Sequence, residues 1–355
     1  MLIFLLPVFS GGGAERVTLN ILTGLHDSGY SVGIITFNKR GSLLSKVPYD
    51  IPIYDLGTIT LKSSIIPLIK EIQKLKPRMV FSTLGYINVT LLLCRIFFPR
   101  SMKIWVREAN LPSISLINNP LSLIMPTLYR LLYKRSDKLI CTSFRMKMEF
   151  VSDFSVPREV IDILPNPVDV DMIRSSISSI ERFDEGGVCY LASGRLTFQK
   201  GFDRLIYWFD KLTNKKSTLV ILGEGLLKKE LINIVKTLGI QNRIKFIGFC
   251  DNPWKWYAGA DVFLLPSRWE GMPNSVLESL VCGTEVIATK ESGGIKEVVE
   301  KGKGVIVVEN DKEFIKAMSK VEIKNKNTAF ESLLPEKYRK EKIIFNIKEW
   351  INEIN

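Results

Sequence analysis

Short apolar runs alternate with helical patterns of hydrophobic residues along almost the whole chain. The runs have the length of buried strands, and the segments between them are long enough for a helix that crosses from one strand to the next. In the first half these runs are residues 2–6, 32–36, 79–82, 104–107 and 139–143, and in the second half they are residues 188–192, 219–222, 244–249, 262–265 and 286–288. This alternation predicts an α/β fold in which parallel sheets carry helices on both faces.

The length of the chain predicts two domains, since 355 residues with 46% hydrophobic and 24% charged side chains exceed one ordinary core. Residues 164–169 contain two prolines and are expected to be extended, because a residue before proline avoids the helical region. We therefore predict an N-terminal domain of residues 1–165 and a C-terminal domain of residues 166–337. Residues 338–355 carry isoleucines and Trp350 at helical spacing, which predicts a final amphipathic helix.

A glycine-rich turn, Gly11-Gly12-Gly13, follows the first strand and precedes a helical pattern. Glycines let the backbone approach a ligand closely at the N-terminus of a helix, where phosphates bind. A nicotinamide-binding fingerprint fits poorly, because Arg16 stands where its last glycine should be and residues 36–38 offer no acidic side chain. A phosphate cradle and a tight turn without a ligand both stay open.

Two carboxylates, Glu270 and Glu278, lie in a pattern of strand, turn and helix start. Pro273 suits the first turn of the helix, so Glu270 falls on the loop and Glu278 on the helix. Open parallel sheets bind their ligands at the carboxyl ends of the strands, where this loop lies. Carboxylates beside an anion site need hydroxyl or cationic partners, which suggests a sugar nucleotide as the ligand.

Arg195 and Lys200 flank another turn that follows a strand. Two fixed cations beside a glycine-bearing loop suit a diphosphate, since they hold it and neutralise the charge that grows as it leaves. Surface charge is the commoner explanation for either residue alone. The turn Gly223-Glu224-Gly225 and the turn after residues 244–249 end at the same edge, as candidates for holding a base and a ribose, although an isolated G-x-G is a weak signal.

The net charge of +12 is concentrated in residues 1–165, which carry 20 Lys and Arg against 11 Asp and Glu. A basic surface attracts nucleic acid, anionic lipid or a phosphorylated substrate, and charge alone does not choose among them. Residues 91–100 and 121–138 combine aliphatic, aromatic and cationic side chains, which suits a membrane interface as well as a core helix with a solvated cationic face. Charges and prolines interrupt both segments, so neither predicts a membrane span.

The sequence gives little support for a disulfide framework, a metal site or a signal peptide. The five cysteines are widely spaced and form no C-x-x-C pair, which indicates buried apolar residues of a cytosolic protein. Asp169 and Asp171 form a D-x-D pair that a helix cap explains better than a metal. The first residues lack a positive segment and end at Pro7, so a buried strand fits them better than a signal peptide.

Six motifs together resemble the retaining GT-B glycosyltransferases of family 4, and most of all those that build bacterial surface polysaccharides on a lipid carrier. The motifs are Gly11-Gly12-Gly13-Ala14-Glu15-Arg16, Asn166-Pro167-Val168-Asp169, Gly194-Arg195-Leu196 with Lys200-Gly201, Gly223-Glu224-Gly225, the Glu270/Glu278 pair and Gly293-Gly294. The resemblance covers nearly the whole chain. It implies two facing Rossmann-like domains, with the acceptor mainly in the first, the nucleotide sugar in the second, and a last helix that crosses back to the first.

The resemblance also implies roles for individual residues. Arg195 and Lys200 would bind the donor diphosphate and stabilise the leaving group. Glu270 would contact hydroxyls of the transferred sugar, and Glu278 would hold the ribose. The other donor-binding residues would be Gly194, Gly223, Gly225, Phe249, Gly271, Met272, Pro273 and Asn274, and the residues on the acceptor side would be Gly12, Gly13, Arg107, Glu108 and Asn110. No metal or cofactor is expected, because the cations and helix ends would take the metal's place.

One position departs from the family pattern. Many relatives carry a histidine where this chain has Ala109, and its only histidine, His26, lies on the first predicted helix, where surface or core packing is expected. Arg107, Glu108 and Asn110 are candidates to replace that contact.

The expected activity is transfer of a hexose or N-acetylhexosamine from a nucleotide sugar, UDP-linked, to a lipid-linked saccharide of O-antigen or capsule. The expected place is the cytoplasm, at the anionic inner face of the cytoplasmic membrane, with no nucleic acid as partner. Two alternatives stay open. A nucleotide-sugar 2-epimerase of the same fold would need titratable acid/base groups, and a glycosyltransferase-like scaffold subunit would need none.

Overall fold

The computed structural model describes residues 1–117, 122–177, 180, 182–184, 186–299, 304–324 and 330–353. Leu121 and Ile354, at the ends of two segments considered above, lie outside this part of the chain. The chain divides into two compact units, Met1–Pro167 with Lys337–Asn355, and Val168–Glu336. Residues 164–167 stay with the first unit because the backbone N–H of Leu164 donates to the Cys141 carbonyl and the amide of Asn166 accepts from buried Arg107.

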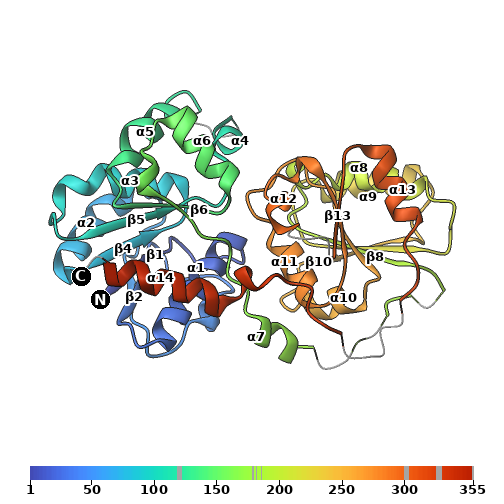
Figure 1. Cartoon of the computed structure of the whole chain (residues 1–355), viewed down its shortest axis with the longest axis horizontal. Helices are drawn as coiled ribbons and strands as arrows, with labels where there is room; N and C mark the ends of the chain where they lie inside the picture. Colours follow the sequence, from blue (N-terminus) through green and yellow to red (C-terminus); the bar gives the residue numbers. More distant parts are fainter. Residues whose placement is uncertain are drawn as a thin grey trace. The chain divides into compact units, whose positions relative to one another are not determined.

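A seven-stranded parallel sheet forms the centre of the first unit (Figure 1), in the order β3-β2-β1-β4-β5-β6-β7. Its strands are β1 (Leu2–Leu5), β2 (Val32–Thr36), β3 (Ile53–Asp55), β4 (Met79–Ser82), β5 (Lys103–Arg107), β6 (Lys138–Cys141) and β7 (Ile161–Ile163). All five strands predicted for this half are present. The sequence did not predict β3 and β7, because three residues are too few to show a periodic pattern.

Helices cover both faces of this sheet. They are α1 (Gly13–Asp27), α2 (Leu61–Leu75), α3 (Gly85–Leu93), α4 (Pro112–Ile117), α5 (Met125–Leu132), α6 (Phe144–Phe154) and α14 (Lys340–Glu353), with short 3₁₀ turns η1 (Leu44–Lys46), η2 (Cys94–Phe97), η3 (Tyr133–Arg135) and η4 (Arg158–Val160). The residues of α1 and α14 share one core, and those of α2, α3, α5 and α6 share the other.

The last helix, α14, returns to the first unit and packs against α1, as expected from the family resemblance. Its inner face buries Ile343, Ile344 and Ile347. Gly24 of α1 makes the close approach possible, since a Cβ at that position would lie 2.5 Å from Cγ1 of Ile344.

A six-stranded parallel sheet forms the second unit, in the order β10-β9-β8-β11-β12-β13. Its strands are β8 (Cys189–Ser193), β9 (Thr218–Leu222), β10 (Ile244–Gly248), β11 (Val262–Leu265), β12 (Val286–Thr289) and β13 (Val305–Val308). All five strands predicted for this half are present, and β13 is additional. In both units the first strand lies inside the sheet and the order reverses beside it, which is the arrangement of a Rossmann-like fold.

The helices of the second unit are α7 (Val170–Ser175), α8 (Phe202–Asp210), α9 (Lys228–Thr237), α10 (Trp254–Gly259), α11 (Asn274–Val281), α12 (Ile295–Val298) and α13 (Asp311–Ser319), with 3₁₀ turns η5 (Phe198–Lys200), η6 (Lys290–Ser292) and η7 (Glu336–Tyr338). One core joins α8, α9 and α13 to the sheet, and Figure 1 shows α10 and α11 on the opposite face. Asp169 caps α7 by accepting from the backbone N–H of Met172, as predicted. None of the described helices is long and apolar enough to cross a bilayer.

Candidate active site

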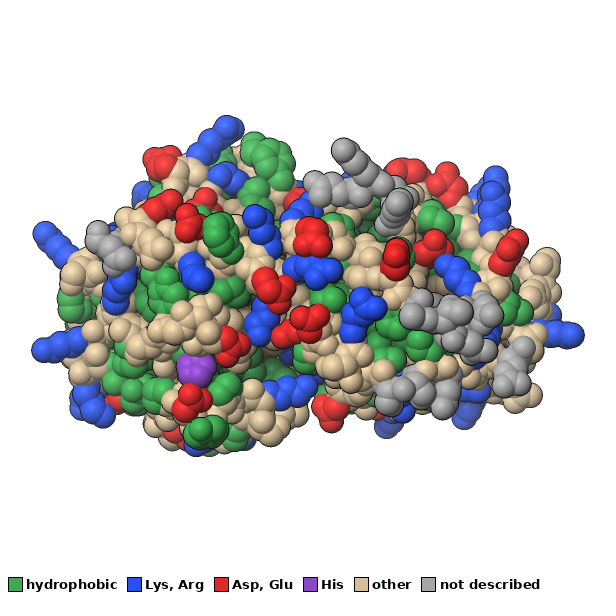
Figure 2. All heavy atoms as spheres, turned by 60° about the horizontal axis from the view of Figure 1, so that its bottom comes forward, with side chains coloured by type: hydrophobic (Ala, Val, Ile, Leu, Met, Phe, Trp, Pro, Cys, Tyr) green, Lys and Arg blue, Asp and Glu red, His purple; other side chains and the backbone are tan. Residues whose placement is uncertain are grey.

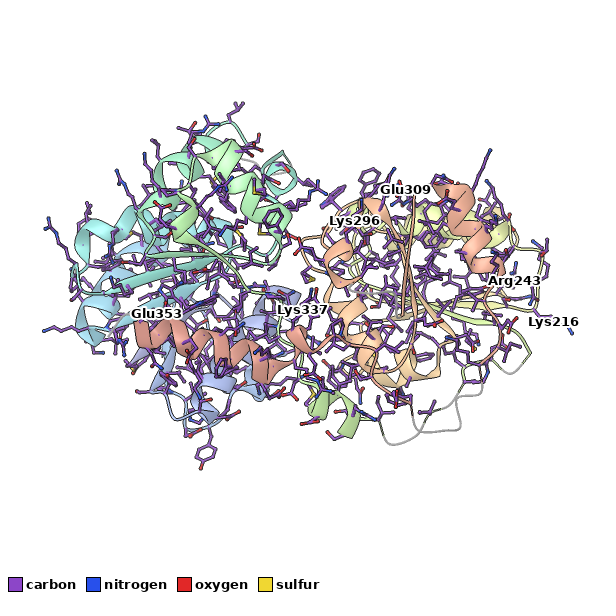
Figure 3. All side chains as sticks on the ribbon, viewed as in Figure 1. Lys216, Arg243, Lys296, Glu309, Lys337 and Glu353 are labelled. Atoms are coloured by element: carbon purple, nitrogen blue, oxygen red, sulfur yellow. The ribbon has the colours of Figure 1, made fainter. Side chains whose placement is uncertain are left out.

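Glycine turns bring backbone segments into direct contact at the carboxyl edge of the second sheet. Figure 3 marks both edges, since Lys216 and Arg243 precede β9 and β10 whereas Glu309 follows β13. Gly223, which follows β9, has φ +132° and no room for a Cβ, which would overlap the carbonyl oxygen of Gly194 after β8. A Cβ on Gly225 would lie 2.5 Å from the Leu196 carbonyl oxygen. The first two glycine turns of this edge are therefore packed backbone on backbone.

The predicted cation and carboxylate, Lys200 and Glu270, form an ion pair at this edge. We call residues Gly194–Gly201 the Lys200 turn and residues Pro266–Pro273 the Glu270 loop. Nζ of Lys200 lies 2.6 Å from Oε1 of Glu270, and the two side chains are 15% and 7% exposed. The pair is thus shielded from bulk water, where its charges would attract each other weakly.

Ser267 adds a contact to which sequence reasoning assigned no role. Its hydroxyl donates to Oε1 of Glu270 over 2.6 Å, so the oxygen that faces Lys200 accepts two hydrogen bonds. Arg204 of α8, also unassigned, donates to the carbonyl oxygens of Pro266 and Ser267 over 2.9 and 3.0 Å. The Glu270 carboxylate is consequently held from both sides of its loop.

Arg195 differs from Lys200 in being exposed. Within the described part of the chain, no hydrogen bond or ion pair is recorded for its side chain. Lys200 packs its stem on Gly194, where a Cβ would lie 3.1 Å from Cε of Lys200. The Lys200 turn therefore offers one cation held in an ion pair and one that extends into solvent.

The rest of the predicted donor site surrounds these turns. The Glu270 loop leads directly into α11, with Pro273 at its N-cap, and Gly271, Met272 and Pro273 are buried. Asn274 and Glu278 are half-buried on α11. Gly294 packs on this loop, because a Cβ there would overlap the Gly271 carbonyl oxygen.

Phe249 follows β10, and its ring is 52% exposed. The turn before it is joined to the Gly223 turn, since the N–H of Gly223 donates to the Gly248 carbonyl over 2.7 Å. The second unit thus brings every residue of the predicted donor set onto adjacent loops or the start of α11.

The glycine turn of the first unit lies at the start of α1, with Gly12 as its N-cap. Glu15, one turn into the helix, folds back over it, and a Cβ on Gly12 would overlap this carboxylate. Ser10 donates to the other oxygen of Glu15 over 2.6 Å. The predicted open turn at Gly12 and Gly13 is therefore covered by a side chain that sequence reasoning did not single out.

Arg107 and Glu108, predicted on the acceptor side, are almost completely buried, whereas Asn110 is exposed. Arg107 ends β5 and donates to the hydroxyl of Thr83 over 3.0 Å and to the amide oxygen of Asn166. Its Nε has no recorded partner among the described residues. Both charged side chains support the loop that carries Ala109 and Asn110 from beneath.

Glu108 accepts three hydrogen bonds within the first unit. Asn88 donates over 2.9 Å, Tyr129 donates over 3.3 Å, and Tyr133 donates as well. Burial raises the pKa of Glu108 to about 7, against the opposing effect of these three donors and of Arg107. Burial also lowers the pKa of Arg107 to about 10. The tyrosines are 21 and 25 residues away in the chain, and no local motif marks them.

His26 is the chain's only histidine and lies on α1. Figure 2 shows it, in purple, at the surface beside acidic side chains. Its Nε2 lies 3.0 Å from Asp50, and its Nδ1 lies 3.7 Å from Asp27. It is a surface residue, as expected, and takes no part in the clusters described above.

Comparisons with known proteins identify the family. The family model "Glycosyltransferase Family 4" matches residues 11–172, and the model "Glycosyl transferases group 1" matches residues 174–332. In the described residues no group of three or more His, Cys, Asp or Glu side chains is arranged to hold a metal ion.

Two relatives match over most of the chain. The N-acetylgalactosamine-N,N'-diacetylbacillosaminyl-diphospho-undecaprenol 4-alpha-N-acetylgalactosaminyltransferase of Campylobacter jejuni is 30% identical, over 85% of this chain and 84% of its own length. The amylovoran biosynthesis glycosyltransferase AmsD of Erwinia amylovora is 22% identical, over 86% and 85%.

Among solved structures, HepE of Anabaena in complex with UDP has a TM-score of 0.77 at 19% identity, with 99% of each chain covered. The lipopolysaccharide outer core galactosyltransferase WaaB has a TM-score of 0.73 at 17% identity, also with 99% coverage. At these identities the likeness shows the fold. Together with the family models and the Campylobacter relative, it shows that the chain is a GT-B glycosyltransferase and belongs to family 4.

Proposed function

We propose that this glycosyltransferase moves a hexose or N-acetylhexosamine from a UDP-linked sugar to a lipid-linked saccharide in surface polysaccharide biosynthesis. The observation that carries the proposal is the shielded Lys200–Glu270 pair beside exposed Arg195, at an edge where glycine turns expose backbone. The substrate class follows from the relatives, since the Campylobacter protein is named for transfer of N-acetylgalactosamine to a saccharide on diphospho-undecaprenol.

The chemistry follows from the charges at this edge. As the bond between the anomeric carbon and the phosphate oxygen breaks, negative charge grows on the diphosphate, and Arg195 and Lys200 neutralise it. Glu270, fixed by Ser267, accepts hydrogen bonds from the sugar hydroxyls. Glu278 holds the ribose from the first turns of α11.

The proposed transfer retains the anomeric configuration and uses no metal ion. The acceptor hydroxyl attacks on the face from which the diphosphate departs, and its proton passes to the departing phosphate oxygen. The new bond therefore joins the acceptor oxygen to the anomeric carbon, and the nucleoside diphosphate leaves with the proton. No separate general base is needed in this scheme.

A turnover assay tests the proposal. The purified chain is incubated with UDP-linked sugars, with and without a polyprenyl-diphosphate saccharide, and released UDP and products are measured. Arg195→Ala, Lys200→Ala and Glu270→Ala should each lower turnover at least about a hundredfold, the range for loss of a charge-stabilising group. Lys216→Ala, at the opposite edge of the sheet, serves as control and should leave turnover unchanged.

Unchanged turnover in all three folded variants would overturn this assignment. Formation of an epimerised nucleotide sugar from donor alone would favour the epimerase instead. Failure of UDP to raise the unfolding temperature would count for a scaffold subunit.

We also propose that the first unit docks on the anionic inner face of the cytoplasmic membrane through a surface built by α3, η2, α5 and η3, which we call the α3–α5 face. α3 contacts α5 and η3. Its exposed apolar side chains include Ile96 and Leu123, which are 77% and 93% exposed. Exposed cations accompany them, namely Arg100, Arg130, Lys134 and Arg135. Apolar and cationic groups together match an anionic lipid surface.

Vesicle sedimentation tests this docking. Replacing Arg130, Lys134 and Arg135 by glutamine should weaken binding to phosphatidylglycerol vesicles about a hundredfold at low salt, at roughly 1 kcal/mol per charge. A matched triple variant with glutamine at Lys211, Lys216 and Lys229 loses the same charge from the second unit and should bind as the wild type. Equal loss in both triple variants, or no binding by the wild type at low salt, would refute the docking.

A further inference from the structure

The Lys200 turn and the Glu270 loop are joined by more than the ion pair between them. The backbone N–H of Arg268 donates to the Gln199 carbonyl over 2.8 Å. The side-chain amide of Gln199 donates in return to the Trp269 carbonyl over 3.0 Å. Residues 199 and 268–269 therefore bind each other directly beside Lys200 and Glu270.

The side chain of Arg268 reaches across to the same turn. Its Nη1 donates to the Phe198 carbonyl over 2.7 Å, and its guanidinium carbon lies 3.8 Å from the centre of the Phe198 ring. Its two terminal nitrogens also bind both carboxylate oxygens of Asp203 on α8, over 2.8 and 2.6 Å. One guanidinium thus fastens the Glu270 loop to the turn that carries Lys200 and to the helix that follows it.

Only arginine has the donors for this arrangement. Its planar fork can bind a carboxylate with two parallel hydrogen bonds and still donate to a carbonyl while it stacks on a ring. A lysine offers a single charged centre, which could pair with Asp203 but could not hold the same geometry. Arg268 is half-buried and makes these contacts without touching Lys200 or Glu270 itself.

We infer that Arg268 is a positioning residue, which holds the Glu270 carboxylate and the Lys200 amine in register by clamping their loops together. The inference rests on the proposed function. A displacement of about 1 Å between reacting groups costs on the order of a hundredfold in rate. Loss of the clamp should therefore lower kcat more than it raises KM.

Steady-state kinetics with a UDP-linked sugar test the clamp. Arg268→Ala should lower kcat about a hundredfold and change KM less than about threefold, and Arg268→Lys should not restore kcat. Arg243→Ala is the matched control, because Arg243 also stacks on a phenylalanine, 4.4 Å from the ring of Phe209, and donates to backbone carbonyls. It lies at the opposite edge of the sheet (Figure 3) and should leave kcat within about twofold of the wild type.

A double variant separates positioning from a general loss of structure. If Arg268 acts through Glu270, adding Arg268→Ala to Glu270→Gln should lower kcat by less than about threefold further, since coupled residues are not additive. A kcat of Arg268→Ala within twofold of the wild type, or the full hundredfold loss again in the Glu270→Gln background, would overturn the inference.

Chemical labelling tests the clamp without any turnover. Lys200 is 15% exposed and paired, so formaldehyde with a mild reductant should methylate it slowly in the wild type. In Arg268→Ala the labelling rate of Lys200, measured by peptide mass spectrometry against Lys216, should rise several-fold. An unchanged rate in folded variant protein overturns the clamp even if no donor is found. Absent turnover in the wild type, with faster labelling in the variant, counts against the proposed function alone and supports the clamp.

Discussion

Replacing Glu108 by glutamine should remove a pH dependence from the stability of the first unit. The carboxyl is 4% exposed and accepts hydrogen bonds from Asn88, Tyr129 and Tyr133. Glutamine keeps the shape and the accepting oxygen but has no proton to lose. The comparison of the two proteins therefore isolates the ionisation of a single buried group.

The sign and size of the effect follow from the pKa of Glu108, which burial raises from 4.5 to about 7. Between these values the unfolded chain has lost the proton and the folded chain still holds it. The stabilisation is therefore complete below pH 4.5 and is lost as the pH rises to about 7. At 1.36 kcal/mol for each unit of pKa, the free energy of unfolding should fall by about 3 kcal/mol across this interval.

Hydrogen exchange under increasing urea provides the assay, because it follows the two units separately through their peptides. The free energy of unfolding is read from the slowest amides of β4 and β5 between pH 4.5 and 7.5. The difference between wild type and Glu108→Gln should change by about 3 kcal/mol over this range. Glu159→Gln, an exposed carboxyl of the same unit, serves as control. Parallel profiles for wild type and Glu108→Gln would refute the assignment of a buried, protonated Glu108.

Two further substitutions test the packing on which the site rests. Gly223→Ala places a Cβ on the Gly194 carbonyl at φ +132° and should cost the second unit more than about 2 kcal/mol, with weaker UDP binding by calorimetry, whereas Gly239→Ala, with φ +69° and nothing within 4 Å, should cost only about 1 kcal/mol. Ile347→Ala in α14 removes a side chain that is 1% exposed and should cost about 2 to 5 kcal/mol in urea unfolding. Phe345→Ala, on the exposed side of the same helix, should cost less than about 0.5 kcal/mol, and equal costs would contradict the observed packing.

The sequence predicted the parts of this fold that have a local signal. Ten apolar runs became strands, and the proline-rich segment at residues 164–169 lies at the observed boundary. Lys200 and Glu270 were predicted as partners of one anionic ligand, and the structure brings them together. Each of these predictions rested on a pattern contained in a few neighbouring residues.

The missed features depend on contacts between distant residues. The partners of Glu108 come from three helical segments, and Asp203 is 65 residues from Arg268. The covering of Gly12 by Glu15 is local, but it depends on a rotamer that no motif specifies. Tyr129 and Tyr133 belonged to a segment considered for the membrane, and the fold instead uses both as hydrogen-bond donors in the core.

Calorimetric titration with UDP tests the central claim most directly, because Lys200 must serve both Glu270 and the diphosphate. Lys200→Ala should weaken UDP binding about ten- to a hundredfold, as expected for loss of a charge-assisted hydrogen bond. Glu270→Gln frees Lys200 from its ion pair, so UDP should bind at least as tightly as to the wild type. The account is contradicted if Lys200→Ala binds UDP with wild-type affinity or if Glu270→Gln loses affinity to the same extent.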